Sequence, residues 1–320
     1  MSKRRLSHNQ RRRIAQQQSR NLRLGEAIDG IVISHYGKEV TVEDSRRQRH
    51  QCKLRQNLGE LVCGDRVSFR PQDDTQHGVV LAIHPRHNLL QKTGFGGQVK
   101  PVAANIDQVL IVCALQPPPN PYLIDRYLVA TENLPARAAL ILNKIDLSDS
   151  NHNTLSELQQ VYRDIALPIF ATSTKTGEGL DALKAWLQHH TSIVVGLSGV
   201  GKSSLVKCIV PNLDIRVGEV SHANHEGTHT TTVSTLYHIP SGGELIDSPG
   251  VRDFTPSIDN RQQILNGFAE LRQAGDRCKF NDCSHSSEPG CAVKQAIDND
   301  EINPQRLQSY LHMLKELEES

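Results

Sequence analysis

Short alternating runs of hydrophobic and polar residues occupy the chain from residue 24 to residue 92. They predict five strands, at residues 27–34, 38–43, 51–54, 65–70 and 79–84. Several short strands separated by glycines are typical of a small closed barrel. We therefore expect an oligonucleotide-binding barrel (OB-fold) over residues 24–92, although a Src-homology-3-like barrel would produce nearly the same pattern.

The pattern changes between residues 93 and 260, where apolar runs alternate with helical segments. Near-continuous apolar runs are typical of strands buried on both faces of a parallel sheet, and they occupy residues 106–115, 138–142, 169–172 and 193–196. Helices are predicted between and after them, at residues 122–132, 155–165, 179–190 and 202–210. This alternation predicts a central α/β domain.

The last segment, residues 261–320, combines predicted helices with a cluster of metal-ligand residue types. The helices are predicted at residues 261–274 and 304–319, and the second carries its large apolar side chains on one stripe. The cluster consists of Cys278, Cys283, His285 and Cys291. Three thiolates and an imidazole form a common tetrahedral set for structural Zn²⁺. We therefore expect a helical zinc-binding domain; the alternatives are unrelated buried cysteines and, less favoured because no C-x-x-C spacing occurs, a redox pair.

A phosphate-binding loop is predicted directly after the apolar run that ends at residue 196. It fits the pattern G-x-x-x-x-G-K-S and consists of Gly196, Leu197, Ser198, Gly199, Val200, Gly201, Lys202 and Ser203. Backbone N–H groups of such a loop, and of the helix that follows it, point at the phosphates. We expect Lys202 to neutralise the β- and γ-phosphates, Ser203 to bind Mg²⁺, and Ser204 to lie in the same GTP site.

A guanine-binding tetrad, N-K-x-D, follows the apolar run that ends at residue 142. Asp146 can accept hydrogen bonds from the ring N–H and the exocyclic amine of guanine, a donor pair that adenine lacks. Lys144 can lie along the face of the base, and Asn143 can brace the loop. Ser173, Thr174 and Lys175 resemble the second guanine-contacting motif of GTPases. Together the two motifs predict a pocket that prefers GTP.

A D-x-x-G switch segment runs from Asp247 to Gly250. We expect Asp247 to hold Mg²⁺ through water and Gly250 to donate its N–H to the γ-phosphate. The next residue is Val251, where many GTPases have a glutamine that orients the attacking water. Since valine cannot orient water, another group must do so.

Residues 223–232 form the other predicted switch and contain His225 and His229. We expect His229 to orient the attacking water, because it adjoins the threonines that should close on Mg²⁺. Thr231 is the expected magnesium contact, with Thr230 as the alternative. Two other interpretations stay open: His229 is a polar loop residue without a catalytic role, or a partner or bound ion completes the site.

Composition adds a basic N-terminal segment and limits the class of protein. The net charge is +1, yet residues 1–23 carry eight Lys or Arg residues and no Asp or Glu. Such a segment is expected to be disordered and to bind nucleic acid, the alternative being a solubilising extension. No apolar stretch approaches the roughly 20 residues of a membrane span, and no signal-peptide core is present, so we expect no membrane partner. Four single cysteines are expected to be buried thiols in a reducing cytoplasm: Cys52, Cys63, Cys113 and Cys208.

The GTPase motifs come in an unusual order, because the guanine tetrad precedes the phosphate loop and the switches come last. With the preceding barrel and the following cysteine cluster, this order resembles the bacterial family of ribosome small-subunit-dependent GTPase A (RsgA/YjeQ), over essentially the whole chain. The most specific elements are residues 227–232, residues 246–251 and the spacing of the cysteine cluster. One mild departure is Thr174, where the family usually has alanine.

The resemblance implies a circularly permuted GTPase that hydrolyses GTP slowly alone and faster on the 30S ribosomal subunit, late in its assembly. It implies binding to 16S rRNA and help in releasing another assembly factor, and it supports the role given to His229. We therefore predict a cytoplasmic GTP hydrolase that yields GDP and phosphate, carries one structural Zn²⁺ and is a monomer when free. The alternatives are a GTP-gated RNA-binding module and a permuted GTPase that acts on another RNA particle.

Two local predictions follow from the motif order and the barrel sequence. The junction at residues 190–191 should mark the former chain terminus of the permuted domain, and the switch at Asp247 should couple to the zinc domain that begins about a dozen residues later. Arg46, Arg47 and Arg49 are interpreted as an RNA-binding barrel loop or, equally, as a solvated charge run.

Overall fold

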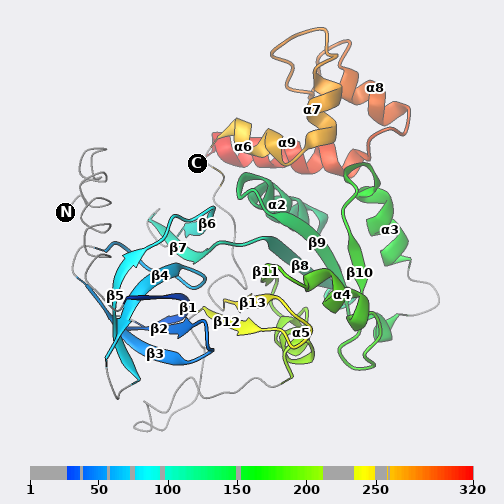
Figure 1. Ribbon diagram of the computed structural model, residues 1–320. Helices are drawn as coiled ribbons and strands as arrows, with labels where there is room; N and C mark the ends of the chain where they lie inside the picture. Colours follow the sequence, from blue (N-terminus) through cyan, green and yellow to red (C-terminus); the bar gives the residue numbers. More distant parts are fainter. Residues whose placement is uncertain are drawn as a thin grey trace.

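The computed structural model describes residues 27–36, 39–55, 58–72, 76–93, 98–148, 153–211, 234–248, 258 and 260–319. Its first part is a closed five-stranded barrel (Figure 1). The strands are β1 (Ile28–Tyr36), β2 (Glu39–Asp44), β3 (Arg49–Leu54), β4 (Arg66–Pro71) and β5 (His77–Ile83).

The barrel strands pair in the order β1–β2–β3–β5–β4, and β4 returns to β1. β3 pairs with β5 in parallel, so the strands do not follow one another as a simple meander. This non-consecutive order is the Greek-key arrangement of an OB-fold, and it confirms the expected barrel. Its interior is apolar, lined by Val32, Val40, Val42, Cys52, Leu61, Val67, Phe69 and Val80.

A small antiparallel hairpin that the sequence pattern did not reveal connects the barrel to the next domain. It consists of β6 (Leu89–Thr93) and β7 (Val99–Ala104). An isolated bridge between Cys63 and Ala103 joins it to the barrel. The boundary expected at residue 92 therefore falls inside β6.

Within the described residues, the central domain contributes six strands of the sheet, in the order β10–β9–β8–β11–β13–β12. Its strands are β8 (Gln108–Ala114), β9 (Arg137–Asn143), β10 (Ile169–Ala171), β11 (Thr191–Gly196), β12 (Thr235–His238) and β13 (Glu244–Asp247). The first five in spatial order are parallel, and β12 is antiparallel to β13. The parallel sheet predicted from the apolar runs is therefore confirmed.

Helices cover both faces of this sheet (Figure 1). One apolar layer contains side chains of α2 (Pro121–Asn133) and α3 (Thr154–Val161), and the other contains side chains of α4 (Leu180–Leu187) and α5 (Lys202–Ile209). β8 is buried along its whole length between the two layers. This burial explains why β8 reads in the sequence as a continuous apolar run.

β12 also pairs with β1, through Ser34 and Thr235, so the barrel and the central sheet form one continuous hydrogen-bonded sheet. The junction expected at the former chain terminus is short, since α4 ends at Leu187 and β11 begins at Thr191.

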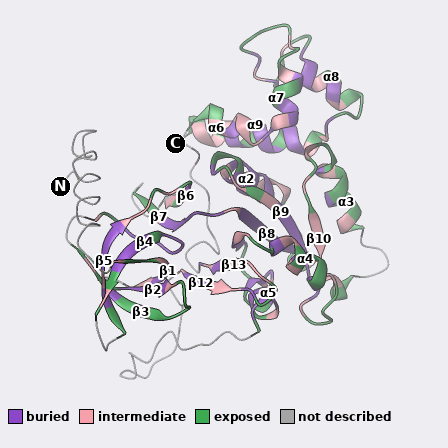
Figure 2. Cartoon of the chain, viewed as in Figure 1, coloured by how far each residue is buried: buried purple, intermediate pink, exposed green. Residues whose placement is uncertain are grey.

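The C-terminal domain contains four helices, α6 (Arg261–Asn266), α7 (Ala269–Gly275), α8 (Ala292–Asp298) and α9 (Pro304–Glu318). The prediction of a single helix over residues 261–274 is wrong, because the helix is interrupted at Gly267. A Cβ atom on Gly267 would lie 2.5 Å from Val129 Cγ2, so glycine is needed where α6 approaches α2. Figure 2 shows that α9 alternates buried and exposed residues, as its apolar stripe predicts.

A buried charged cluster fastens this domain to α2. Arg306 has 1% of its surface exposed, and it donates to Asp125 Oδ1 and to Glu270 Oε1, both at 2.6 Å. It also donates to the Gly267 carbonyl at 2.9 Å, while its guanidinium lies 4.3 Å from the centre of the Phe268 ring. The C-terminal domain therefore packs on the central domain through a buried network of ion pairs as well as through apolar contacts.

Within the described part of the chain, no helix has the length and apolar character that a membrane crossing requires.

Candidate nucleotide site and metal cluster

The predicted phosphate loop connects β11, at the centre of the sheet, to the start of α5. Gly196, Gly199 and Gly201 have φ angles of 135°, 80° and 95°, which favour glycine. A Cβ on Gly196 would lie 2.2 Å from the Val112 carbonyl oxygen. The loop therefore needs glycine both for its backbone conformation and for its close approach to β8.

The guanine tetrad and the phosphate loop are in direct contact, although 57 residues separate Asn143 from Val200. Asn143 is fully buried, and its Nδ2 donates to the Val200 carbonyl at 2.9 Å. A Cβ on Gly201 would lie 2.3 Å from this nitrogen. The Asn143 side chain at the end of β9 is thus hydrogen-bonded to the phosphate loop.

Lys144 makes a second bridge between the same two segments. Its φ of 61° is left-handed, and its Nζ donates at 2.6 Å to the carbonyls of Gly199 and Gln116. The Gln116 contact is one that sequence reasoning missed. It involves a backbone oxygen in the loop after β8, and no side-chain motif marks such a contact.

Asp146 lies in the short 3₁₀ helix η2 (Ile145–Leu147) and faces the second predicted guanine motif. Its Oδ1 accepts a hydrogen bond from Ser173 Oγ at 2.6 Å, and Lys175 Nζ lies 3.9 Å from Oδ2. The Ser173 hydroxyl in turn accepts from the backbone N–H of Lys175. These contacts hold the carboxylate in a defined direction next to the loop that contains Thr174.

The magnesium-binding candidates described by the structure follow the carboxyl ends of two neighbouring strands, β11 and β13. Ser203 is exposed in the first turn of α5, and Asp247 ends β13. β11 and β13 are adjacent and parallel, so their carboxyl ends lie side by side. Lys202 is buried, and its Nζ donates to the loop carbonyls of Gly196, at 2.8 Å, and Leu197.

The remaining predicted switch residues, His229, Thr230, Thr231, Gly250 and Val251, lie outside the described residues, as does the basic segment 1–23. Their roles stay predictions.

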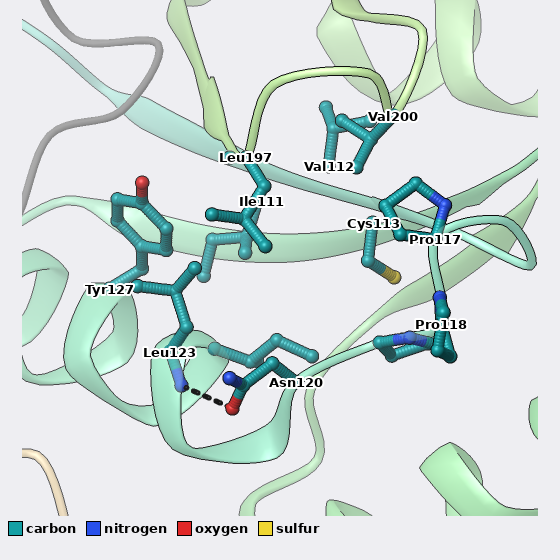
Figure 3. Close-up of a pocket in the computed structure, with 13 residues that line it drawn as sticks. Ile111, Val112, Cys113, Pro117, Pro118, Asn120, Leu123, Tyr127, Leu197 and Val200 are labelled. Atoms are coloured by element: carbon teal, nitrogen blue, oxygen red, sulfur yellow. Dashed lines mark hydrogen bonds between the residues drawn. The ribbon is translucent and has the colours of Figure 1, made fainter.

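A small apolar pocket lies beside the phosphate loop (Figure 3). Leu197 and Val200 of the loop face Pro117 and Tyr127, which belong to the connection after β8 and to α2. The nearby Asn120 side chain caps α2 by accepting from the Leu123 N–H at 3.2 Å. Because its lining is apolar, this pocket does not suit phosphate. It lies where the phosphate loop packs against α2.

The predicted metal ligands converge between α7 and α8. The ligand atoms of Cys278, Cys283, His285 and Cys291 all lie within 4.8 Å of one another. His285 Nδ1 is 3.7 Å from Cys278 Sγ and 3.5 Å from Cys291 Sγ. Tetrahedral Zn²⁺, with bonds of about 2.0–2.3 Å, requires ligand separations of roughly 3.5–3.8 Å. The geometry therefore fits a four-coordinate metal ion.

Backbone N–H groups support the thiolates of this cluster. The Ala292 N–H donates to Cys278 Sγ at 3.3 Å. Burial opposes ionisation of Cys278, but hydrogen bonds from the backbone of Ala292 and Val293 lower the pKa of this thiol below its usual value. A deprotonated thiol is the form that binds metal.

The four single cysteines have a different environment. Cys52, Cys63 and Cys113 are buried as expected, and burial raises the pKa of Cys52 and of Cys113 to about 12. Cys208 is only half-buried, because it lies on the edge of α5 where its thiol contacts the Thr174 carbonyl. The expectation of burial is thus wrong for Cys208.

Comparisons with known proteins agree with this arrangement. The family model of the RsgA GTPase matches residues 83–256. A protein of Saccharophagus degradans named small ribosomal subunit biogenesis GTPase RsgA is 41% identical, over 100% of this chain and 98% of its own. A protein of the same name from Ectopseudomonas mendocina is 46% identical, over 92% of this chain and 88% of its own.

Two solved structures are similar over nearly the whole chain. The crystal structure of YjeQ from Thermotoga maritima has a TM-score of 0.73 and 36% identity, and covers 91% of this chain and 98% of that one. The structure of YloQ, described as a circularly permuted GTPase, has a TM-score of 0.70 and 26% identity, and covers 93% of this chain and 97% of that one. The chain therefore belongs to the RsgA GTPase family and is a GTP hydrolase.

Proposed function

We propose that the protein hydrolyses GTP while bound to the small ribosomal subunit, as an assembly factor for that particle. One observation carries the proposal: Asn143 and Lys144 of the guanine tetrad are hydrogen-bonded to the phosphate loop at Val200 and Gly199. The base-binding and phosphate-binding motifs are therefore parts of a single site. The relatives named above are small ribosomal subunit biogenesis GTPases.

In this proposal the chain's own residues bind and orient GTP for in-line attack by water. Asp146 accepts from the guanine, and Thr174 and Lys175 line the same pocket. Lys202 offsets the charge that develops on the γ-phosphate. The residues that would hold Mg²⁺ are Ser203, Thr231 and Asp247, and the ion would supply charge stabilisation at the β- and γ-oxygens.

His229 is proposed to orient the attacking water, because Val251 stands where a glutamine would otherwise do so. His229→Ala should lower GTP turnover by about 100-fold or more, which is the usual contribution of a general base or water-positioning group. GTP binding should stay near normal. His225→Ala is the matched control, and unchanged turnover in His229→Ala would reject the assignment.

An exposed basic row on the barrel supports binding to rRNA. Alternate residues of β3 point outward and place Arg49 and Lys53 on one face, which Arg55 extends. Lys53 and Arg55 are two residues apart, about 6.6 Å along the strand, which suits successive phosphates of an RNA strand, and Arg49 lies about 13 Å from Lys53. Arg46 and Arg47 are exposed at the β2–β3 turn beside this row. We propose that these side chains contact 16S rRNA.

The C-terminal cluster is proposed to hold one structural Zn²⁺. All four ligand positions come from the protein, so no position is left for a reacting water. The ion would stabilise the loop between α7 and α8 and so shape a second rRNA-binding surface. We further propose that the free protein is a cytoplasmic monomer.

The test is GTP turnover measured alone and with purified 30S or 50S particles. We expect stimulation by 30S particles only. Stimulation by 50S particles alone would instead favour a GTPase of another RNA particle. Nucleotide-dependent 30S binding without any stimulation would favour a module in which GTP only sets RNA affinity. Either result would overturn the proposal.

A further inference from the structure

The β12–β13 hairpin occupies a special place between the barrel and the nucleotide site. In the sequence it lies between the two predicted switch segments, and β13 ends at Asp247. In the structure its other strand, β12, pairs directly with β1 of the barrel. A force on this hairpin from the barrel would therefore reach the predicted switch segments that flank it in the sequence.

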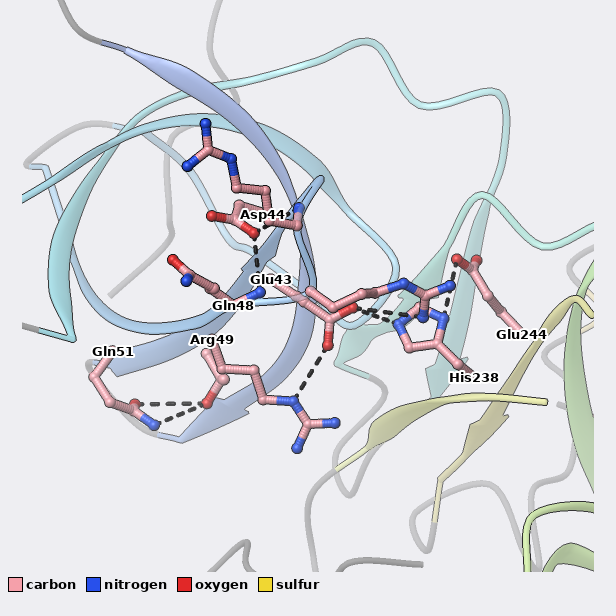
Figure 4. Close-up of polar contacts among 10 residues, drawn as sticks. Glu43, Asp44, Gln48, Arg49, Gln51, His238 and Glu244 are labelled. Atoms are coloured by element: carbon pink, nitrogen blue, oxygen red, sulfur yellow. Dashed lines mark hydrogen bonds and ion pairs between the residues drawn. The ribbon is translucent and has the colours of Figure 1, made fainter. Parts of the chain in front are cut away.

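One buried carboxylate joins this hairpin to the exposed basic surface of the barrel (Figure 4). Glu43, on β2, is only 3% exposed. Its Oε1 accepts from His238 Nε2, on β12, at 2.5 Å. Its Oε2 accepts from Arg49 Nε at 3.2 Å, and Arg47 lies 3.8 Å away.

The contacts continue from His238 toward the strand of the phosphate loop. His238 Nδ1 lies 3.8 Å from Glu244 Oε1, on β13. The other oxygen of Glu244 accepts from Thr191 Oγ1 at 2.8 Å. Thr191 is the first residue of β11, which leads into the phosphate loop. A line of polar contacts thus runs from the barrel surface to the GTPase sheet.

The partners of Glu43 differ in exposure, and this difference gives the contact a direction. The side chain of Arg49 is 45% exposed and that of Arg47 is 63% exposed, so both can reach an RNA phosphate. His238 is 21% exposed and stays against the barrel. Burial alone would raise the pKa of Glu43, but hydrogen bonds and charge from His238 and Arg49 outweigh burial and lower this pKa. A buried carboxylate that loses one cationic partner is costly, so it interacts more strongly with the partner that remains.

We propose that Glu43 is a positioning residue that couples an RNA phosphate at Arg47 and Arg49 to the β12–β13 hairpin, and so to GTP turnover. A phosphate that draws Arg49 away shifts the interaction of Glu43 toward His238, which tightens the hairpin against the barrel. The proposal rests on the proposed function, since it explains how a ribosomal RNA contact is transmitted to the GTPase site.

The experiment compares turnover at saturating 30S subunits with turnover of the free protein, for Glu43→Gln and His238→Gln. Each variant keeps a hydrogen-bonding side chain, but Glu43→Gln removes the carboxylate and His238→Gln removes the imidazole. We expect unstimulated turnover and GTP affinity to stay within about 2-fold of wild type, and stimulation to fall by about 5-fold or more. Because both changes break the same contact, the double variant should be no worse than either single variant.

Two further variants separate coupling from folding and from RNA affinity. Glu39→Gln removes an exposed carboxylate from the same strand and should keep full stimulation. Arg49→Lys keeps a charge for the phosphate but lacks the Nε donor to Glu43, so it should bind subunits in co-sedimentation yet lose stimulation.

The outcomes are distinguishable. A wild-type protein that 30S subunits do not stimulate would overturn the proposed function and the coupling together. A stimulated wild type with fully stimulated Glu43→Gln and His238→Gln variants would overturn only the coupling. Additive losses in the double variant, or losses explained by weaker subunit binding, would also overturn it.

Discussion

Asp146 shows how nucleotide specificity can be set by one side chain whose direction is fixed. Its carboxylate is oriented by Ser173 at 2.6 Å. Asp146→Asn would replace one acceptor by an amide donor, which opposes the amine of guanine but matches the carbonyl that xanthine carries there. GTP affinity should fall by about 10- to 100-fold, the cost of an unmatched polar group, while xanthosine triphosphate should bind more tightly than GTP.

Competition between the two nucleotides in a binding assay measures this reversal. Asp181→Asn is the control and should keep the preference for GTP, because Asp181 is an exposed acidic residue in the first turn of α4. Retained GTP preference in Asp146→Asn would contradict the assignment of Asp146 to the base.

Glu43 also gives the barrel a dependence on pH. Its pKa in the folded protein is lowered from 4.5, mainly because His238 and Arg49 outweigh the opposing effect of burial. The unfolded chain therefore takes up this proton first as the pH falls. The contribution of Glu43 to stability is complete above about 4.5 and is lost at lower pH. The thermal stability of wild type should thus fall more from pH 6 to pH 4, values on either side of the unfolded-chain pKa of 4.5, than that of Glu43→Gln. Equal pH dependence of the two proteins would contradict this role.

At the scale of elements, the loop between α7 and α8 should depend on its metal ion. Cys283 is buried among the other ligand residues, and Cys283→Ser removes one thiolate. Metal affinity should fall by roughly 100-fold or more, since the four ligands of a structural site together contribute about 10–16 kcal/mol. Metal analysis of the purified protein and amide exchange in α7 and α8 measure the loss.

Cys208→Ser is the matched control, because Cys208 lies on α5 outside the cluster and should leave the metal content unchanged. Chelation of wild type should loosen the same two helices and leave GTP binding within about 3-fold of its original value, because the nucleotide site draws no ligand from this loop. Full metal occupancy in Cys283→Ser would rule out the proposed ligand set.

Elements with a strong local signal could be predicted from the sequence. The five barrel strands, the buried parallel strands and the phosphate loop each carry their pattern within a few residues. The helix break at Gly267 and the contact of Lys144 with Gln116 could not, because their causes lie in distant segments: Val129 in the first case and a backbone carbonyl in the second. The β6–β7 hairpin has no clear alternation of hydrophobic and polar residues, since β7 is exposed at Val99 and buried only from Val102 to Ala104.

The functional sites show the same difference between local sequence signals and contacts made by distant segments. The phosphate-loop residues and the cysteine cluster could be singled out from the sequence because their spacing reflects local chemistry. The Glu43–His238 contact spans 195 residues and joins two domains, so nothing in either segment alone indicates it.

At the scale of the whole molecule, the three parts are joined by different kinds of contact. The barrel shares a sheet with the central domain through β1 and β12. The C-terminal domain instead docks on α2 through apolar contacts and the buried Arg306 network. Any coupling between the Asp247 switch and the C-terminal domain would act across this interface. Motion transmitted through the paired strands β1 and β12 would leave the Arg306 network intact.

Arg306→Met tests how far this interface depends on its buried charges. The change leaves Asp125 and Glu270 without their shared cation, at positions that are 0% and 8% exposed. Loss of one partner from a buried ion network costs about 3–5 kcal/mol, so the C-terminal domain should unfold well before the rest of the molecule in calorimetry. Burial raises the pKa of Asp125 even beside Arg306, so this carboxyl should take up a proton in the variant, and the destabilisation should grow as the pH rises.

Arg277→Met removes only an exposed ion pair with Glu301 and should cost less than about 1 kcal/mol. A variant that combines Arg306→Met with Asp125→Asn and Glu270→Gln should recover part of the loss, because no buried charge is then left unpaired. If Arg306→Met were as stable as Arg277→Met, apolar packing alone would hold the C-terminal domain on α2.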